Sequence, residues 1–156
     1  MKKIFFIVAI LATVFAQKTI AQINTQPSQL LNSYLDIKNA LIAGNANIAS
    51  AKAEEFVKTL NSLDAKTFSA DSHDALLKDA EHITKLKDIK YQREHFSTFS
   101  SNMYILAKAV KLTDQPVYYA YCPMKKTHWL SVEPAIKNPY FGSAMLTCGK
   151  VEETLK

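Results

Sequence analysis

The chain has 156 residues and a formal net charge of +5, from 19 basic and 14 acidic residues. Lys2, Lys3 and Lys18 lie in a predicted targeting segment, so without these three the chain carries 16 basic and 14 acidic residues. This near balance excludes the dense basic surface typical of nucleic-acid-binding proteins, and we expect no nucleic-acid partner. The remainder, about 135 residues, is long enough for one domain with its own core.

Residues 1–21 have the pattern of a secretory signal peptide. A basic start at Lys2 and Lys3 precedes an apolar run from 4 to 15, and small residues then offer cleavage after Ala16 or Ala21. The run is too short for a comfortable membrane span, so we expect export to the periplasm by a cleaved signal. A retained membrane anchor is the alternative interpretation. No later segment is apolar enough to cross a bilayer, so we expect no span in the mature chain.

The mature region, 22–156, is predicted to form a single helical-bundle domain. Four segments repeat apolar residues at helical spacing: one from Leu30 to Ile42 that ends at Gly44-Asn45, one capped by Asn47 and reaching about Leu63, one capped by Asp71 or Ser72 and reaching Leu86, and one from about Asp88 or Tyr91 to Leu112. Four antiparallel helices are the natural way to bury four such stripes.

The pattern changes after Pro116. An aromatic and β-branched run from Val117 to Tyr121 predicts a strand that Pro123 ends, and residues 128–132 are predicted to return beside it. Asn138 to Gly142 has turn composition, and residues 145–148 fit a short strand or a helical turn. The predicted fold is therefore mainly α, a four-helix antiparallel bundle with a small C-terminal β-hairpin or loop cap.

Four sulfur atoms gather in the C-terminal motif region, 117–151. Cys122 and Met124 are two residues apart, a spacing that shares one face of a strand, and Met145 and Cys148 are three apart, a spacing that shares a helical turn. Thiolates and thioethers are soft donors that suit Cu(I) or related ions. If the two segments meet in space, they form one metal site.

Other interpretations of these residues stay open. In an oxidising compartment, spacing alone favours a Cys122–Cys148 disulfide over metal thiolates. Met145 fits core packing better than ligation, because methionine fills gaps beside aromatic rings. His95 suits a ligand and a buried hydrogen-bonding residue equally well, whereas His128 fits a solvated strand position better than a place near Cys122.

Signatures of catalysis are weak. The chain has no Cys-x-x-Cys, no glycine-rich phosphate loop, no Gly-x-Ser-x-Gly elbow and no His-Glu-x-x-His. Cys122 could serve as a thiol nucleophile with His128 or His95 as its base. No oxyanion hole and no third group that would orient the base can be named for such a site. We therefore expect a protein that is not an enzyme.

The C-terminal motifs and one helical motif resemble a bacterial exported family catalogued as domain of unknown function 3347. The residues that carry the resemblance are Tyr118 to Met124, Trp129 to Ser131, Asn138 to Gly142, Met145 to Gly149, and Arg93 to Ser97. Members of that family also occur attached to periplasmic adaptors of heavy-metal efflux pumps, which implies handling of copper or silver. Cys122-Pro123-Met124 is also partly similar to the heavy-metal-binding domain of copper and silver exporters. That domain has a tyrosine where this chain has Ala120 and a histidine where it has Lys125.

With the resemblance, metal binding becomes the favoured hypothesis. We expect a periplasmic protein that binds Cu(I) or Ag(I) and buffers the metal or delivers it to an efflux system. A periplasmic adaptor of a heavy-metal efflux pump is the expected partner. The expected metal ligands are Cys122, Met124, Met145, Cys148 and His95. The alternative is a structural or interaction module that a Cys122–Cys148 disulfide stabilises.

Overall fold

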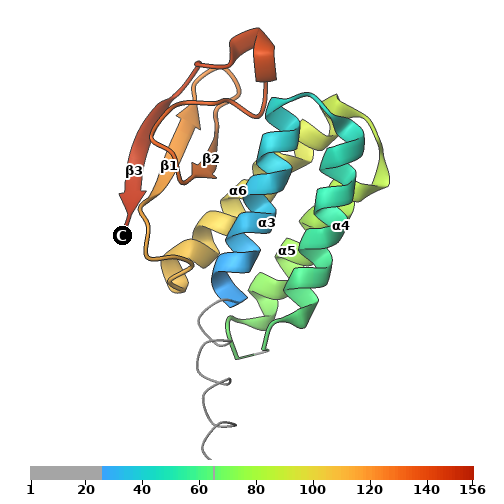
Figure 1. Ribbon diagram of the computed structural model, residues 1–156, viewed down its shortest axis with the longest axis vertical. Coiled ribbons are helices and arrows are strands. Elements are labelled where there is room, and N and C mark those ends of the chain that lie inside the picture. Colours follow the sequence, from blue (N-terminus) through green and yellow to red (C-terminus); the bar gives the residue numbers. More distant parts are fainter. Residues whose placement is uncertain (1–25, 65) are drawn as a thin grey trace, which may run out of the picture.

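The computed structural model describes residues 26–64 and 66–156, so the predicted signal peptide lies outside the described residues. Within these residues, four helices follow one another: α3 (Gln26–Ile42), α4 (Ala46–Ser62), α5 (Ala70–Lys85) and α6 (Ile89–Ala109). Figure 1 shows them as neighbouring, roughly parallel rods, with the sheet on the side of α3 and α6. The predicted helical bundle with a small C-terminal β cap is confirmed.

Capping side chains set where the helices begin. Asn45, not Asn47, caps α4 by accepting a hydrogen bond from Ile48 N at 3.0 Å. The cap of α5 is Ser69, which accepts a bond from Ser72 N at 3.2 Å, so the predicted caps at Asp71 and Ser72 are wrong. Both corrections have one cause. Several polar residues precede each helix, and the cap is the one whose side chain accepts a bond from the amide two or three residues further on, here Ile48 N and Ser72 N.

The fourth helix starts as predicted and ends early. Asp88 caps it by accepting a hydrogen bond from Tyr91 N at 2.7 Å. It stops at Ala109, three residues before the predicted Leu112, where Val110 takes an extended conformation. Leu112 is nevertheless buried, so it contributes to the core from outside the helix. No helix within the described ranges combines the length and apolar content needed to cross a bilayer.

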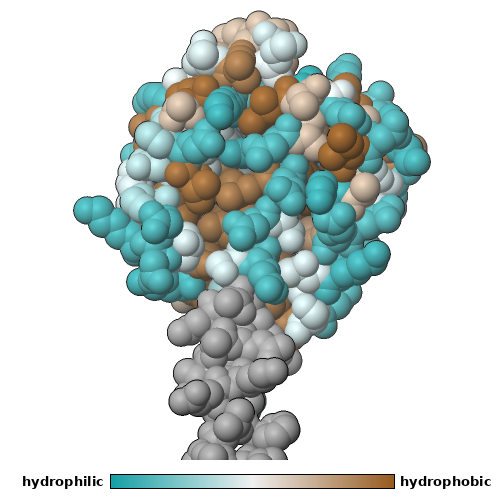
Figure 2. Space-filling model, in the orientation of Figure 1, coloured by the Kyte–Doolittle hydropathy of each residue, from teal (hydrophilic) through white to brown (hydrophobic). Residues whose placement is uncertain are grey.

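Aromatic rings fill the centre of the bundle. Tyr34 of α3 stacks on Phe96 of α6 with ring centroids 5.3 Å apart, and Phe56 of α4 meets Phe99 edge-on at 4.8 Å. The hydroxyl of Tyr34 lies 2.7 Å from that of Ser100, which satisfies both polar groups inside the core. On the surface, Figure 2 shows hydrophobic residues in the middle of this face, where the sheet meets α3, with hydrophilic residues around them.

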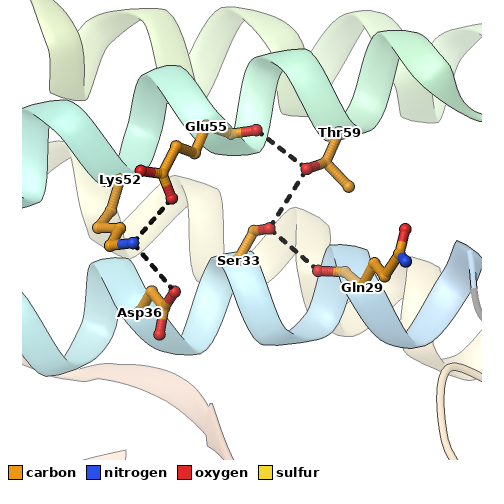
Figure 3. A network of polar contacts seen from close by, with 6 residues as sticks. All are labelled: Gln29, Ser33, Asp36, Lys52, Glu55 and Thr59. Carbon is orange, nitrogen blue, oxygen red and sulfur yellow. Dashed lines mark hydrogen bonds and ion pairs between the residues drawn. The ribbon is translucent and has the colours of Figure 1, made fainter.

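An exposed polar network lies along the seam between α3 and α4 (Figure 3). Lys52 reaches Glu55 on its own helix at 2.8 Å and Asp36 of α3 at 3.6 Å. Beside it, the hydroxyls of Ser33 and Thr59 lie 3.4 Å apart. Exposed ion pairs of this kind each stabilise a fold by at most about 1 kcal/mol, so the aromatic core is the main support of the bundle.

The C-terminal third forms an antiparallel sheet of three strands in the order β2-β1-β3. Its strands are β1 (Val117–Cys122), β2 (Thr127–Ser131) and β3 (Lys150–Leu155), and the 3-10 helix η1 (Gly142–Met145) lies between β2 and β3. β1 and β2 match the predicted hairpin, whereas β3 was not predicted. Leu130 N donates to the Tyr34 hydroxyl at 3.0 Å, which ties β2 to the bundle.

Candidate metal centre

Cys122 is fully buried at the end of β1, where Pro123 interrupts the strand. Its sulfur accepts two hydrogen bonds, from the side-chain amide of Asn138 at 3.1 Å and from the backbone amide of Lys125 at 3.4 Å. A charged acceptor forms stronger hydrogen bonds than a neutral one, and a metal-bound sulfur carries negative charge. The two donors are therefore compatible with a sulfur that binds a cation.

Cys148 brings the second sulfur to the same place. It follows η1, and its amide donates to the Met145 carbonyl at 3.1 Å, which closes one helical turn. Burial raises the pKa of the Cys148 thiol, and the charge and hydrogen bonding of the neighbouring Cys122 thiol raise it further. A backbone hydrogen bond at Met124 acts in the opposite direction and lowers the pKa. The two cysteines, 26 positions apart in the sequence, thus form an interacting pair of free thiols, named here the sulfur pair.

Asn138 joins the two sulfur-bearing segments. Its side-chain nitrogen donates to Cys122 Sγ and also to the Cys148 carbonyl at 2.7 Å, and its side-chain oxygen accepts from Tyr140 N at 2.8 Å. The residue is completely buried, and its amide group finds partners on both sides. Sequence reasoning assigned Asn138 only to a turn. The buried amide is the largest feature of the site that the prediction missed.

Gly149 lets the second segment approach the sheet. A Cβ atom there would lie 2.8 Å from the Trp129 ring and 2.8 Å from the Tyr121 carbonyl oxygen, closer than real Cβ contacts. Its φ of +150° is also a conformation that residues with a side chain rarely adopt. A glycine directly after Cys148 is therefore what allows this cysteine to lie beside β1.

The two methionines are placed differently. Met124 is 64% exposed, so the prediction that it shares a strand face with Cys122 is wrong. The reason is local: β1 ends at Cys122, and a turn closed by the bond from Lys126 N to Cys122 O at 2.8 Å carries Met124 outward. Met145 is half-buried in η1, and the expected helical turn between Met145 and Cys148 is present.

His95 lies between α5 and α6. Its ring stacks on His82 with centroids 4.4 Å apart and on Tyr91 at 4.3 Å, and burial together with His82 lowers its pKa. Its described contacts are thus with its helical neighbours, and none is with the sulfur pair. His128 pairs with Glu152 at 2.9 Å and stacks on Tyr119 at 4.4 Å, which agrees with a strand position away from Cys122.

The donor set of the site is small and soft. Within residues 26–64 and 66–156, no three His, Cys, Asp or Glu side chains gather as a metal-binding group. Ions such as Zn²⁺ prefer four nitrogen, sulfur or oxygen ligands, whereas soft thiolates and thioethers select Cu(I). Two thiols, with the nearby exposed Met124, therefore fit a soft monovalent ion of low coordination number best.

Comparisons with known proteins give one match. No curated protein and no solved structure matches the chain. The family model described as "Protein of unknown function (DUF3347)" matches residues 30–115, which cover the described helices except the first turn of α3 and end before β1. The match therefore rests on the scaffold and leaves the sulfur-bearing motifs outside it. Because it covers more than half of the 156 residues, this chain belongs to the DUF3347 family.

Proposed function

We propose that this protein is an exported binding protein for a soft monovalent metal ion, Cu(I) or Ag(I). The observation that carries the proposal is the contact between the thiols of Cys122 and Cys148, with Asn138 and the Lys125 amide donating to one of the sulfurs. Soft thiolate donors suit these ions. Met124 is exposed beside the pair, so its thioether is available as a further donor.

The electrostatics of the pair favour a bound cation. Two neighbouring thiolates repel one another, and this repulsion contributes to the raised pKa of Cys148. A cation between the sulfurs removes that repulsion while displacing their protons. Metal binding therefore releases protons and strengthens as the pH rises. Asn138 and the Lys125 amide also donate hydrogen bonds to the Cys122 sulfur, and such bonds strengthen when the sulfur carries the negative charge of a metal ligand.

In the cell, the proposed role is to buffer the metal or deliver it, without catalytic turnover. A periplasmic adaptor of a heavy-metal efflux pump is the proposed partner. Delivery suits the geometry, because Cys148 is half-buried and Met124 is exposed, whereas Cys122 is sealed. An incoming ion would therefore meet Met124 and Cys148 first and Cys122 last. We place Met145 and His95 as secondary candidates.

The same contact supports a second candidate function. Two adjacent thiols in an exported protein can oxidise to a disulfide, which would pin η1 and β3 to β1. The protein would then be a structural or interaction module. In the chain-entropy model, a closure of this length stabilises the fold by roughly 3–4 kcal/mol.

A thiol count combined with a metal titration distinguishes the two functions. Protein isolated from the periplasm is denatured without oxygen and its free thiols are counted. A second sample is titrated with Cu(I) against a chromophoric chelator. Metal binding predicts two free thiols and one tightly bound ion per chain, and both thiols become protected from alkylation. No free thiols together with no uptake of Cu(I) would overturn the proposal.

Single substitutions assign the ligands. Cys122→Ser and Cys148→Ser should each weaken Cu(I) binding by at least about a hundredfold, since one of two main ligands is lost (about 2.7 kcal/mol at 1.36 kcal/mol per factor of ten). Met124→Leu should weaken it less. His95→Gln tests the secondary candidate on α6, and it should bind as tightly as the unchanged protein if His95 serves the α5–α6 contact alone. His73→Gln is the matched control, because His73 contacts Asn61 and Asp74 and is not a candidate ligand.

A further inference from the structure

A cavity of about 310 Å³ lies next to the sulfur pair. Three cationic side chains line it, from Lys90 and Arg93 on α6 and from Lys125 in the turn after β1. Ile89 and Phe141 provide apolar wall. Lys125 links the cavity to the sulfur pair, because it lines the cavity and its backbone amide donates to Cys122 Sγ.

The cations of this cavity lack carboxylate partners. Among the ion pairs of the described residues, none includes Lys90, Arg93 or Lys125. Glu94 is the single acidic side chain on the wall, and it forms no ion pair either. The lining therefore carries a net charge of +2. Three cations that share one acidic neighbour repel one another, so an anion in the cavity would be attracted.

Arg93 gives the most specific sign of a missing partner. One of its terminal nitrogens donates to the Leu41 carbonyl at 2.7 Å, at the C-terminal end of α3. Its Nε atom is buried and has no hydrogen-bond partner among the described atoms. Burial also lowers the pKa of the guanidinium. A partly buried cation with an unsatisfied N–H is costly unless an anion or an acceptor meets it.

Two further features favour an anion that carries an apolar group. The cavity lies at the first turns of α6, the end of a helix that bears partial positive charge. Ile89 and Phe141 contribute apolar and aromatic surface to the lining, and Tyr140 lines the cavity with its hydroxyl already donating to the His128 carbonyl. A volume near 300 Å³ is at the lower end of small-molecule sites.

We infer that this cavity binds a small organic anion. The carboxylate or phosphate group of the ligand would lie among Lys90, Arg93 and Lys125, and its apolar body would lie against Ile89 and Phe141. The inference does not depend on metal binding, since it uses none of the sulfur atoms. Asn138 connects the two sites, because it holds both Cys122 Sγ and the amide of Tyr140. A ligand in the cavity is therefore in a position to influence the sulfur pair.

The test is an NMR titration of the metal-free mature chain, residues 22–156. The probes are benzoate and phenyl phosphate, with inorganic phosphate as the head group alone and benzyl alcohol as the uncharged analogue. We expect saturable shifts of the backbone amides of Lys90, Lys125 and Phe141 with one of the aromatic anions, and weaker binding of the other two probes. The better of benzoate and phenyl phosphate identifies the head group as a carboxylate or a phosphate.

Charge substitutions complete the test. The double variant Lys90→Gln/Lys125→Gln should bind roughly tenfold more weakly, which corresponds to about 1.4 kcal/mol. Lys87→Gln is the matched control, because Lys87 is an exposed lysine that does not line the cavity. Arg93 is left unchanged, since it also supports α3. The inference is overturned if no aromatic anion gives saturable shifts, if benzyl alcohol binds equally well, or if Lys87→Gln weakens binding as much as the double variant.

Discussion

Replacing Asn138 by alanine should disconnect the two halves of the sulfur site. The side chain is fully buried and makes three hydrogen bonds, to Cys122 Sγ at 3.1 Å, to the Cys148 carbonyl at 2.7 Å and from Tyr140 N at 2.8 Å. Removing the side chain leaves the Cys148 carbonyl and the Tyr140 backbone amide without these partners. A buried polar group that loses its partner costs about 1–3 kcal/mol. Sulfur is a weak acceptor, so we assign little free energy to the bond that Asn138 donates to Cys122 Sγ.

The expected loss is therefore about 3–4 kcal/mol in the free energy of unfolding. For a domain of this size, that corresponds to a fall of roughly 10 °C in Tm. Trp129 is the sole tryptophan, is buried, and lies against Gly149, so its fluorescence reports the region directly. Urea denaturation followed at this residue gives the free energy of unfolding for Asn138→Ala.

Two further variants serve as comparisons for Asn138→Ala. Asn39→Ala, at an exposed position of α3, should change the free energy of unfolding by less than about 0.5 kcal/mol. Asn138→Asp keeps an acceptor for Tyr140 N, loses both donated bonds, and places a negative charge beside Cys122, so it should also disfavour a thiolate there. If Asn138→Ala stays within about 1 kcal/mol of the unchanged protein, the account of Asn138 as the link between the segments is wrong.

Two further predictions concern stability. Burial lowers the pKa of Lys38 to about 8 from an ordinary value of 10.5. The folded protein thus releases this proton before the unfolded chain does, and stability should rise between about pH 8 and 10.5 by up to about 3 kcal/mol. Lys38→Met should flatten this rise in pH-dependent urea denaturation and stabilise the protein at pH 7, and an unchanged slope would contradict the assignment. Gly142→Ala should lower the free energy of unfolding by about 2–3 kcal/mol, because φ is +55° and a Cβ would lie 2.7 Å from Ile42 O. Thermal denaturation checks this second prediction, and a Tm equal to that of the unchanged protein would refute it.

The bundle was predictable because its signals are local. Apolar residues at helical spacing marked all four helices, and Gly44 marked the end of the first. The caps were harder, since Asn45 and Asn47 are chemically equal candidates and the choice depends on which amide each side chain reaches. β3 was missed because half of its residues are charged and most of them are exposed. It is an edge strand, held by pairing with β1 rather than by a buried apolar face.

The site was predictable only in its sulfur atoms. The sequence placed Cys122 and Cys148 among the candidates because soft donors are rare in this chain, and the structure brings them together. The partners of Cys122 follow from tertiary contacts: Asn138 is 16 positions away in the sequence, and an Asn-Pro pair is typical of a turn whether or not its side chain is buried. For Met124, the sequence predicted a place on the same strand face as Cys122. That prediction failed because β1 ends at Cys122, and the two-residue spacing rule holds only within a strand.

X-ray absorption spectroscopy of the mature protein loaded with one equivalent of Cu(I) tests metal binding most directly. The proposal predicts a first shell dominated by sulfur at roughly 2.3 Å, with at least two sulfur atoms per copper. It also predicts that this shell changes when Cys122 and Cys148 are both replaced by serine. A first shell of nitrogen or oxygen in the unchanged protein, or the same spectrum in the double serine variant, would contradict it.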